Sequence, residues 1–429
     1  MKKVTALKRR TRSTTLRRTV AGSLAAAALV GALAAGVASG ATAAGKGGGP
    51  LNIWEWQGGT SYIPVFQAAG QRYTAKYGGT PTLDSVPFAS YFTKFTTDVA
   101  AGSGVPDVME MSWTGEYRSL VDSGTLLPLD KYLPSLPKFY GPVMKSLTYK
   151  GHIYGIPMDL NTLTIAYNTS LFAKLGLKVP TTFAQLLALG TKIRAAGDQP
   201  LAVNLMDGWP DSDLWFSQLA YTDPTHNLIT KAEAGTASWN NPQFVQAATD
   251  VQEMTKDGLI ADGSSSLTLT SLAAAFGSGQ TVMMYPAGNF DTSLINQADN
   301  GKFTYKLFPF PPLKAGQKPL ATGGPAIIWS IPAKAANPTG AINYIRETVN
   351  KAGYAEEIKR NFIPSAPTNT SSNKSAIYTQ MVGFQPTAQT RAIFLPAVAT
   401  ELQNAMQALI SGTATPAQVG SDLRTAAAG

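Results

Sequence analysis

Short β-rich runs alternate with amphipathic helical runs from residue 51 onward, and this alternation restricts the chain to the α/β class. Residues 51–56 and 82–86 have strand character, while 63–77 and 91–101 carry apolar residues at helical spacing. Strands that alternate with helices predict a mainly parallel sheet flanked by helices. The 429 residues suffice for two compact lobes, and no long linker divides the sequence. We therefore expect the chain to pass from one lobe to the other more than once.

The same pattern continues to the end of the sequence. We expect further strands at 105–111, 201–205, 281–285 and 326–331. We expect further helices at 114–121, 181–195, 211–221, 244–257, 269–276, 339–350 and 392–410.

The formal charge of +9 comes from one end of the chain. Eight Lys and Arg residues precede position 20, and the first acidic residue is Glu55. Without those eight, the remaining Lys and Arg of the total of 35 nearly balance the 26 Asp and Glu. The charge therefore gives no reason to expect a nucleic-acid partner.

The basic stretch is followed by an uncharged, Ala-rich run over 20–37 and by the small residues Ala41-Thr42-Ala43. This order is typical of a secretory signal over 1–43, so we expect export to the periplasm, the cell surface or the medium. An uncleaved anchor is the alternative, because residues 20–44 are long enough to span a bilayer. The pair Arg17-Arg18 leaves Sec and twin-arginine export both open.

The chain has no cysteine and only two histidines, His152 and His226. This composition excludes disulfides, thiolate metal sites and cysteine nucleophiles, and it argues against a multi-histidine metal site. We therefore expect no metal and no cofactor.

Polar and aromatic residues follow several predicted strands, where open α/β sheets bind their ligands. Glu55, Trp56 and Gln57 come after the first strand, and Trp113 after the third. A pyranose ring presents an apolar face that stacks on aromatic rings and hydroxyl groups that need polar partners. The residues at the strand ends therefore favour a small carbohydrate ligand; Asp207, Trp209 and Asn289 lie at the ends of later strands.

An ordered set of short motifs from about residue 51 to the end resembles a known family. These motifs are 104–108, 120–129, 151–157, 165–168, 180–183, 274–283, 308–311 and Gly323-Gly324. In this order they resemble the extracellular solute-binding proteins of ABC importers, family 1, the sugar-binding group that includes maltose-binding protein. Two departures are the Asn289 that stands about where some sugar binders have a stacking tryptophan, and the absence of a lipidation cysteine.

The resemblance implies a two-lobed periplasmic-binding-protein-like fold with a hinge crossed near Leu160, Phe308 and Ser365. The N-terminal lobe would comprise 44–160 and 309–364, and the C-terminal lobe 161–308 and 365–429. Residue reading and resemblance together give these candidate ligand-binding residues: Glu55, Trp56, Gln57, Trp113, Asp159, Asn161, Asp207, Trp209, Asp211, Tyr285, Asn289, Gly323 and Gly324.

The resemblance implies a monomeric receptor that captures a small carbohydrate and delivers it to the membrane permease of an ABC importer, without catalysis. A polyamine ligand stays open because Glu55, Asp159 and Asp207 are acidic, whereas an organophosphate would need basic residues that the strand ends lack. A secreted glycoside hydrolase, with two carboxylates such as Glu55, Asp159 or Asp211 as its acid and its nucleophile or base, is the alternative from another class.

Overall fold

The structure is a computed structural model. It describes residues 47–429 apart from 58–59, 112–114, 225–226, 300–303 and 391–393. The signal predicted over 1–43 and the candidate residue Trp113 lie outside the described residues. Within the described part of the chain, no helix combines the length and the apolar character that crossing a membrane requires.

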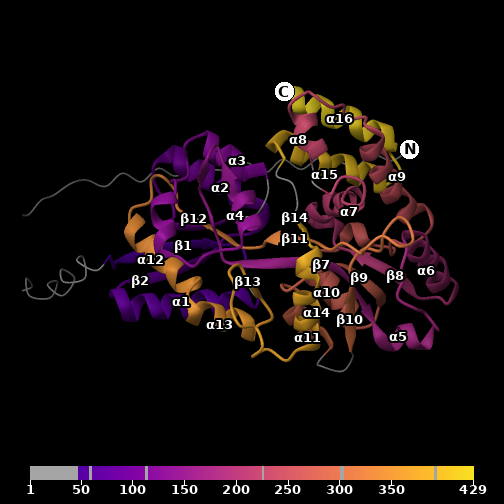
Figure 1. The fold of residues 1–429 in the computed structure, drawn as a ribbon, viewed down its shortest axis with the longest axis horizontal. Helices are drawn as coiled ribbons and strands as arrows, with labels where there is room; N and C mark the ends of the chain where they lie inside the picture. The colour runs from indigo at the N-terminus through magenta and orange to yellow at the C-terminus, as the bar shows by residue number, and fades with distance from the viewer. Residues whose placement is uncertain (1–46, 58–59, 112–114, 225–226, 300–303, 391–393) are drawn as a thin grey trace, which may run out of the picture. The chain divides into compact units, whose positions relative to one another are not determined.

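The first sheet has the strand order β2-β1-β3-β12-β6 (Figure 1). Its strands are β1 (Pro50–Glu55), β2 (Thr80–Ser85), β3 (Val108–Met111), β12 (Ile328–Ser330) and β6 (Ile156–Pro157). β1 is parallel to β2 and β3, whereas β12 is antiparallel to β3 and β6. A separate hairpin pairs β4 (Thr148–Tyr149) with β5 (His152–Ile153).

Helices cover both faces of this first sheet. They are α1 (Tyr62–Tyr77), α2 (Phe88–Ala101), α3 (Gly115–Asp122), α4 (Gly141–Leu147), α12 (Pro338–Thr348) and α13 (Lys351–Lys359). In Figure 1, α1 lies with α12 and α13 on one side of β1, and α2 lies on the other side. Because the chain moves from β1 outward to β2 and then back across to β3, right-handed connections place α1 and α2 on opposite faces.

Helix α1 shows how local sequence produces this packing. Val65, Phe66, Ala69 and Tyr73 recur at helical spacing and are all buried in the core of the first sheet. The helix ends at Gly78, whose φ of 77° is a left-handed conformation that glycine adopts without the steric cost of a Cβ atom.

The second sheet has the order β14-β11-β7-β9-β8, and β10 and β13 also pair with β7. Its strands are β7 (Asp159–Asn168), β8 (Gln199–Val203), β9 (Thr281–Ala287), β10 (Tyr305–Phe308), β11 (Thr322–Pro325), β13 (Ile363–Pro364) and β14 (Gln389–Thr390). The ten-residue strand β7 is central and antiparallel to β9, β10, β11 and β13.

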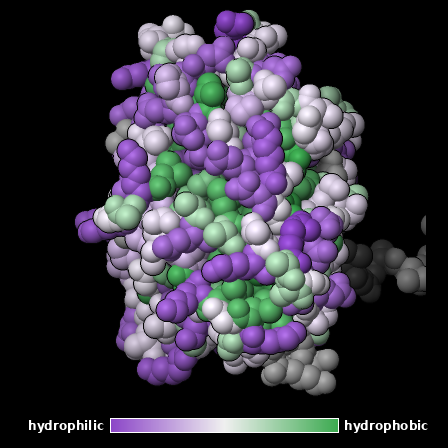
Figure 2. Space-filling view, turned by 90° about the vertical axis from the view of Figure 1, so that its right-hand side faces the viewer, coloured by the Kyte–Doolittle hydropathy of each residue, from purple (hydrophilic) through white to green (hydrophobic). Residues whose placement is uncertain are grey.

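Helices also pack against the second sheet. They are α5 (Thr169–Lys174), α6 (Phe183–Ala195), α7 (Trp209–Leu219), α8 (Asn227–Glu233), α9 (Pro242–Lys256), α10 (Leu269–Gly277), α11 (Thr292–Asp299), α14 (Ala376–Phe384), α15 (Pro396–Ile410) and α16 (Pro416–Ala428). A hydrophobic core that includes Trp215, Phe244 and Leu402 joins α7, α9 and α15. The surface on the side shown in Figure 2 is mostly hydrophilic, with hydrophobic patches between the polar groups.

The predicted α/β class is confirmed, and each expected strand and helix has a counterpart with shifted ends. The expectation of mainly parallel sheets needs a correction, because both sheets are mixed. In the first sheet β12 runs antiparallel to β3 and β6. In the second sheet the antiparallel strand is β7, which the sequence pattern does not predict as a strand. Its burial pattern has no alternation of exposed and buried residues, so the usual signal of a half-buried strand is missing.

The chain passes between the two sheets several times. It leaves the first sheet after β6 and enters the second at β7, and it returns between β11 and β12. After α12 and α13 it joins the second sheet again at β13. The residue boundaries of the two lobes stay predictions. An ion pair connects a helix packed with the first sheet to one packed with the second: Arg118 Nη1 of α3 lies 2.9 Å from Glu233 Oε2 of α8.

Candidate functional site

The first group of candidate residues lies at the carboxyl end of β1. Glu55 is fully buried, and its carboxylate accepts hydrogen bonds from the Ser85 hydroxyl and the Gln57 backbone N–H. Gln57 Nε2 in turn donates to Glu110 Oε1 at 2.7 Å, and the Trp56 backbone N–H donates to Glu110 Oε2 at 3.1 Å. Two of the predicted residues, Trp56 and Gln57, thus bind the carboxylate of Glu110, which the prediction did not include.

Glu110 was missed because it lies within β3, between Met109 and Met111, and reads as part of a buried strand. Its side chain is fully buried, and an acidic residue inside an apolar strand is the signal that would have found it. Burial raises the pKa of Glu110 well above its usual range, against the opposing effect of the Gln57 and Trp56 hydrogen bonds. Burial also raises the pKa of Glu55.

Trp56 is half-buried and packs on the aromatic side chains of α2. Its ring centroid lies 4.8 Å from that of Tyr91 and 5.4 Å from that of Phe88, both in edge-on geometry. These contacts fix the ring while part of its surface stays exposed, which is the condition for stacking on a ligand.

The second group centres on Asp159, the first residue of β7. Its Oδ2 accepts hydrogen bonds of 2.8 Å from Tyr62 Oη and of 2.8 Å from Asn289 Nδ2. Its Oδ1 accepts a bond of 3.0 Å from the Ile327 backbone N–H. Asp159, Asn289 and Tyr62 are all buried, so residues from three distant parts of the chain share one buried carboxylate.

The charge state of this group depends on its burial. Desolvation raises the pKa of Asp159 to about 7, against the opposing effect of its three hydrogen-bond donors. Burial, followed by the charge of Asp159, also raises the pKa of Tyr62 well above its usual range, so Tyr62 stays a donor. Tyr62 lies just before the helix expected over 63–77 and is not among the predicted site residues; its ring stacks on Phe362 at 3.9 Å between centroids.

The third group lies where β11 pairs with β7. Gly323 is opposite Thr162, and Gly324 is opposite Asn161. A Cβ atom on Gly323 would lie 2.5 Å from the Asn161 backbone oxygen, and Gly324 has a φ of 123°. Asn161 Oδ1 is buried and has no hydrogen-bond partner, so it is an acceptor available to another group.

The fourth group lies at the start of α7. Asp207 Oδ2 accepts bonds from Asn204 Nδ2 at 2.6 Å and from the Leu269 backbone N–H at 2.8 Å, so this side chain connects β8 to the beginning of α10. Trp209 is half-buried, and its ring meets that of Phe290 at 6.2 Å. Because Phe290 directly follows Asn289, this contact places Trp209 next to the neighbour of a residue of the second group.

Two remaining candidates lie in different surroundings. Tyr285 is fully buried in the core of the second sheet, where its ring packs on Phe310 at 4.8 Å and its hydroxyl lies 3.3 Å from Ser217 Oγ. Asp211 is fully buried and lines a pocket of about 740 Å³ that contains none of the residues of the first three groups. Among the described residues, no cluster of His, Cys, Asp and Glu is arranged to hold a metal ion.

A comparison with known protein families shows to which family this chain belongs. The profile of the family described as bacterial extracellular solute-binding protein matches residues 55–351, more than half of the sequence. The chain belongs to this family. The match contains Glu55, Asp159, Asn289 and the glycine pair, so the residues described above lie within the solute-binding family region.

Relatives and solved structures support this assignment. A Brucella abortus protein named only as a binding protein is 26% identical over 257 residues, which cover 59% of this chain and 61% of that protein. The multiple sugar-binding protein of Streptococcus mutans is 25% identical over 282 residues, 62% of either chain. The GacH receptor of Streptomyces glaucescens, solved without ligand and with acarbose, matches with a TM-score of 0.72 at 21% identity and covers 88% of this chain and 97% of its own. This likeness confirms the two-lobed solute-binding fold.

Proposed function

We propose that this protein is an extracytoplasmic receptor that captures a small carbohydrate between two lobes and delivers it to the permease of an ABC importer. The family match over residues 55–351 is the observation that carries the proposal. Two similar proteins are named for sugar ligands, the multiple sugar-binding protein of Streptococcus mutans and the acarbose-binding GacH receptor. The chain spans about 61% of the length of the Brucella relative, so the partners of the whole protein belong to the proposal.

The chemistry of the candidate residues supports a carbohydrate. Trp56 and Trp209 are half-buried rings held by other aromatic side chains, and such rings stack on the apolar face of a pyranose. Gln57 and Asp207 are also half-buried and carry polar groups that hydroxyls can bind. The buried acceptors Asn161 Oδ1 and Asn289 Oδ1 have no hydrogen-bond partner, and each would accept from a ligand hydroxyl.

The same proposal includes the organisation inferred from the sequence. Residues 44–160 and 309–364 would form the N-terminal lobe, and 161–308 and 365–429 the C-terminal lobe. A ligand that binds better when the lobes are closed shifts the population towards the closed state. The receptor would be an exported monomer without catalytic activity, with residues 1–43 as its signal.

The test is thermal unfolding of the chain from residue 44 onward across a panel of mono- and oligosaccharides, polyamines and phosphate esters. A ligand at 100 times its Kd adds about 2.7 kcal/mol to the free energy of unfolding, which raises Tm by a few degrees. A shift with one sugar class supports carbohydrate capture. A shift only with a polyamine or a phosphate ester would keep the receptor and overturn the ligand. Sustained release of reducing sugar from oligosaccharides would overturn the receptor in favour of a hydrolase.

A further inference from the structure

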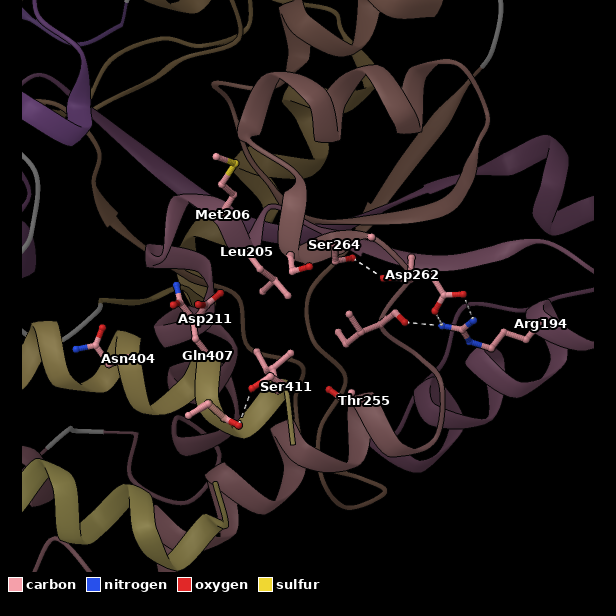
Figure 3. Close-up of a pocket in the computed structure, with 16 residues that line it drawn as sticks. Arg194, Leu205, Met206, Asp211, Thr255, Asp262, Ser264, Asn404, Gln407 and Ser411 are labelled. Atoms are coloured by element: carbon pink, nitrogen blue, oxygen red, sulfur yellow. Dashed lines mark hydrogen bonds and ion pairs between the residues drawn. The ribbon is translucent and has the colours of Figure 1, made fainter. Parts of the chain in front are cut away.

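The pocket beside Asp211 shares the start of α7 with the proposed carbohydrate site, but Trp56, Gln57, Asn161, Asp207, Trp209 and Asn289 do not line it. Its volume of about 740 Å³ is within the range of small-molecule sites. The wall is formed by the start of α7, the end of α9 with the loop after it, and one face of α15 (Figure 3). Trp56, Asp159 and Asn289 are not among its lining residues.

Asp211 is the unusual group in this pocket. The residue is fully buried, and neither Oδ1 nor Oδ2 has a hydrogen-bond partner of normal geometry. Figure 3 shows the Asp211 carboxylate beside the Gln407 and Asn404 side chains on one side of the pocket. A buried carboxylate without well-placed donors is costly, because it has lost its hydration and gained little in return.

The charges around Asp211 favour a cation. Burial, with smaller contributions from the like charges of Asp207 and Asp213, raises the pKa of Asp211 to about 8, whereas the Gln407 side chain and the Asp211 backbone N–H oppose this rise. The polar residues that α15 and its C-terminal cap present to the pocket are the uncharged Asn404, Gln407 and Ser411.

Arg194 of α6 also lines the pocket, but its guanidinium is bonded elsewhere. Nη1 and Nη2 lie 3.1 and 3.0 Å from the Asp262 carboxylate, and Nε and Nη2 donate to the backbone oxygens of Gly258 and Ile260. Figure 3 places this pair on the far side of the pocket from Asp211. The arginine therefore does not neutralise the buried carboxylate.

The rest of the lining is apolar or weakly polar. Leu205, Ile260, Ala408 and Ile410 offer hydrocarbon surface, and Thr255 Oγ1 is a buried hydroxyl without a partner. A ligand with one ammonium group and a short apolar chain matches this combination, because its N–H groups pair with the carboxylate while its carbons lie on the apolar wall.

From this geometry we propose that the pocket is a second ligand site, which binds a small organic ammonium ion through the Asp211 carboxylate. The ammonium donates two or more hydrogen bonds to Oδ1 and Oδ2, and binding converts the carboxyl group to its ionised form with release of a proton. The site is separate from the proposed carbohydrate site and does not depend on it.

The test uses n-butylammonium as the probe and n-butanol as its uncharged counterpart. Protein with ¹³C-labelled isoleucine δ1 methyl groups is titrated by NMR, with Ile260 and Ile410 as reporters in the pocket wall. The Ile410→Val variant assigns one of the two signals. We expect a saturable shift of both signals with butylammonium and none with butanol, and an apparent affinity that falls about tenfold for each pH unit below 8.

Two variants complete the design. Asp211→Asn removes the charge at constant size and should abolish the shift. Asp250→Asn changes another buried acid of the same lobe, on α9, which does not line the pocket, and should leave the shift intact. The proposal is overturned by the absence of a saturable shift up to about 10 mM, by an equal response to butanol, or by undiminished binding to folded Asp211→Asn protein.

Discussion

Asn289 donates a hydrogen bond of 2.8 Å from Nδ2 to Oδ2 of Asp159, although 130 positions separate the two residues. The same amide also donates to the Leu160 backbone oxygen at 3.1 Å. Since Asp159 begins β7 and Asn289 follows β9, the bond fixes the loop after β9 on the start of the central strand. Asn289 therefore has a structural role in addition to its proposed contact with a ligand.

We expect Asn289→Ala to lower the free energy of unfolding by about 1–3 kcal/mol, because Asp159 and the Leu160 oxygen each lose a buried donor. Urea denaturation measures the change. Asn240→Ala, at an exposed asparagine before α9, is the control and should change the free energy by less than about 0.5 kcal/mol. Equal stability of the two variants would show that the Asn289 amide contributes nothing.

Part of this arrangement could be predicted from the sequence. Glu55, Trp56, Gln57, Asp207 and Trp209 could be proposed from the sequence because they lie at or shortly after the ends of strands with clear patterns. Asp159, Asn161 and the glycine pair came only from the resemblance, because β7 is buried along its length and its residues show no alternation. Local sequence does not show which side chains from distant parts of the chain contact each other.

Other features could not be predicted for the same physical reason. The pairing of Asp159 with Tyr62 and Asn289 depends on the order of strands in two mixed sheets, and that order follows from packing rather than from local propensity. Glu110 has a local signal, an acidic residue inside the apolar strand β3, but the sequence does not show that Gln57 and Trp56 bind its carboxylate.

Asp159 and Asp211 should make the protein less stable as the pH rises. Their folded-state pKa values are about 7 and about 8, whereas the ordinary value of an aspartate is 3.8. Between about pH 4 and pH 8 the folded chain therefore binds more protons than the unfolded chain, and the free energy of unfolding falls over this window by a few kcal/mol.

Calorimetry from about pH 4 to pH 9 tests this expectation, with a higher Tm expected near pH 5 than near pH 8. Asp211→Asn should flatten the part of the curve between about pH 6 and pH 8, because the substituted amide does not titrate. A Tm that rises steadily over this window would show that the two carboxyl groups are ionised in the folded protein.

Trp209→Ala should weaken carbohydrate binding by about tenfold or more while leaving the Tm of the unliganded protein nearly unchanged. The ring is half-buried, and its described aromatic contact is with Phe290 at 6.2 Å. Trp215→Ala, six residues later in the same helix, is the matched control. Trp215 is fully buried and donates from Nε1 to the Phe244 oxygen at 3.2 Å, so its loss should cost about 3–5 kcal/mol of stability.

Isothermal titration calorimetry with the sugar identified by thermal unfolding, and Tm measurements without sugar, separate the two roles. A large loss of unliganded stability with unchanged affinity would show that Trp209 is a core residue.

Gly323→Ala should destabilise the pairing of β11 with β7. The added methyl group would lie 2.5 Å from the Asn161 backbone oxygen, which lies in the neighbouring strand and cannot move without disturbing the register. We expect a loss of about 1–3 kcal/mol in urea denaturation, together with weaker ligand binding if Asn161 contacts the ligand.

Gly383→Ala is the matched control for this substitution. Gly383 lies within α14, and a Cβ atom there would meet no other atom within 4 Å. Alanine lowers the conformational entropy of the unfolded chain and favours the helix, so this variant should gain about 0.5–1 kcal/mol. Opposite signs for the two Gly→Ala changes would assign the cost at Gly323 to the close approach of the strands. A stable Gly323→Ala protein would instead show that β11 can shift away from β7 at little cost.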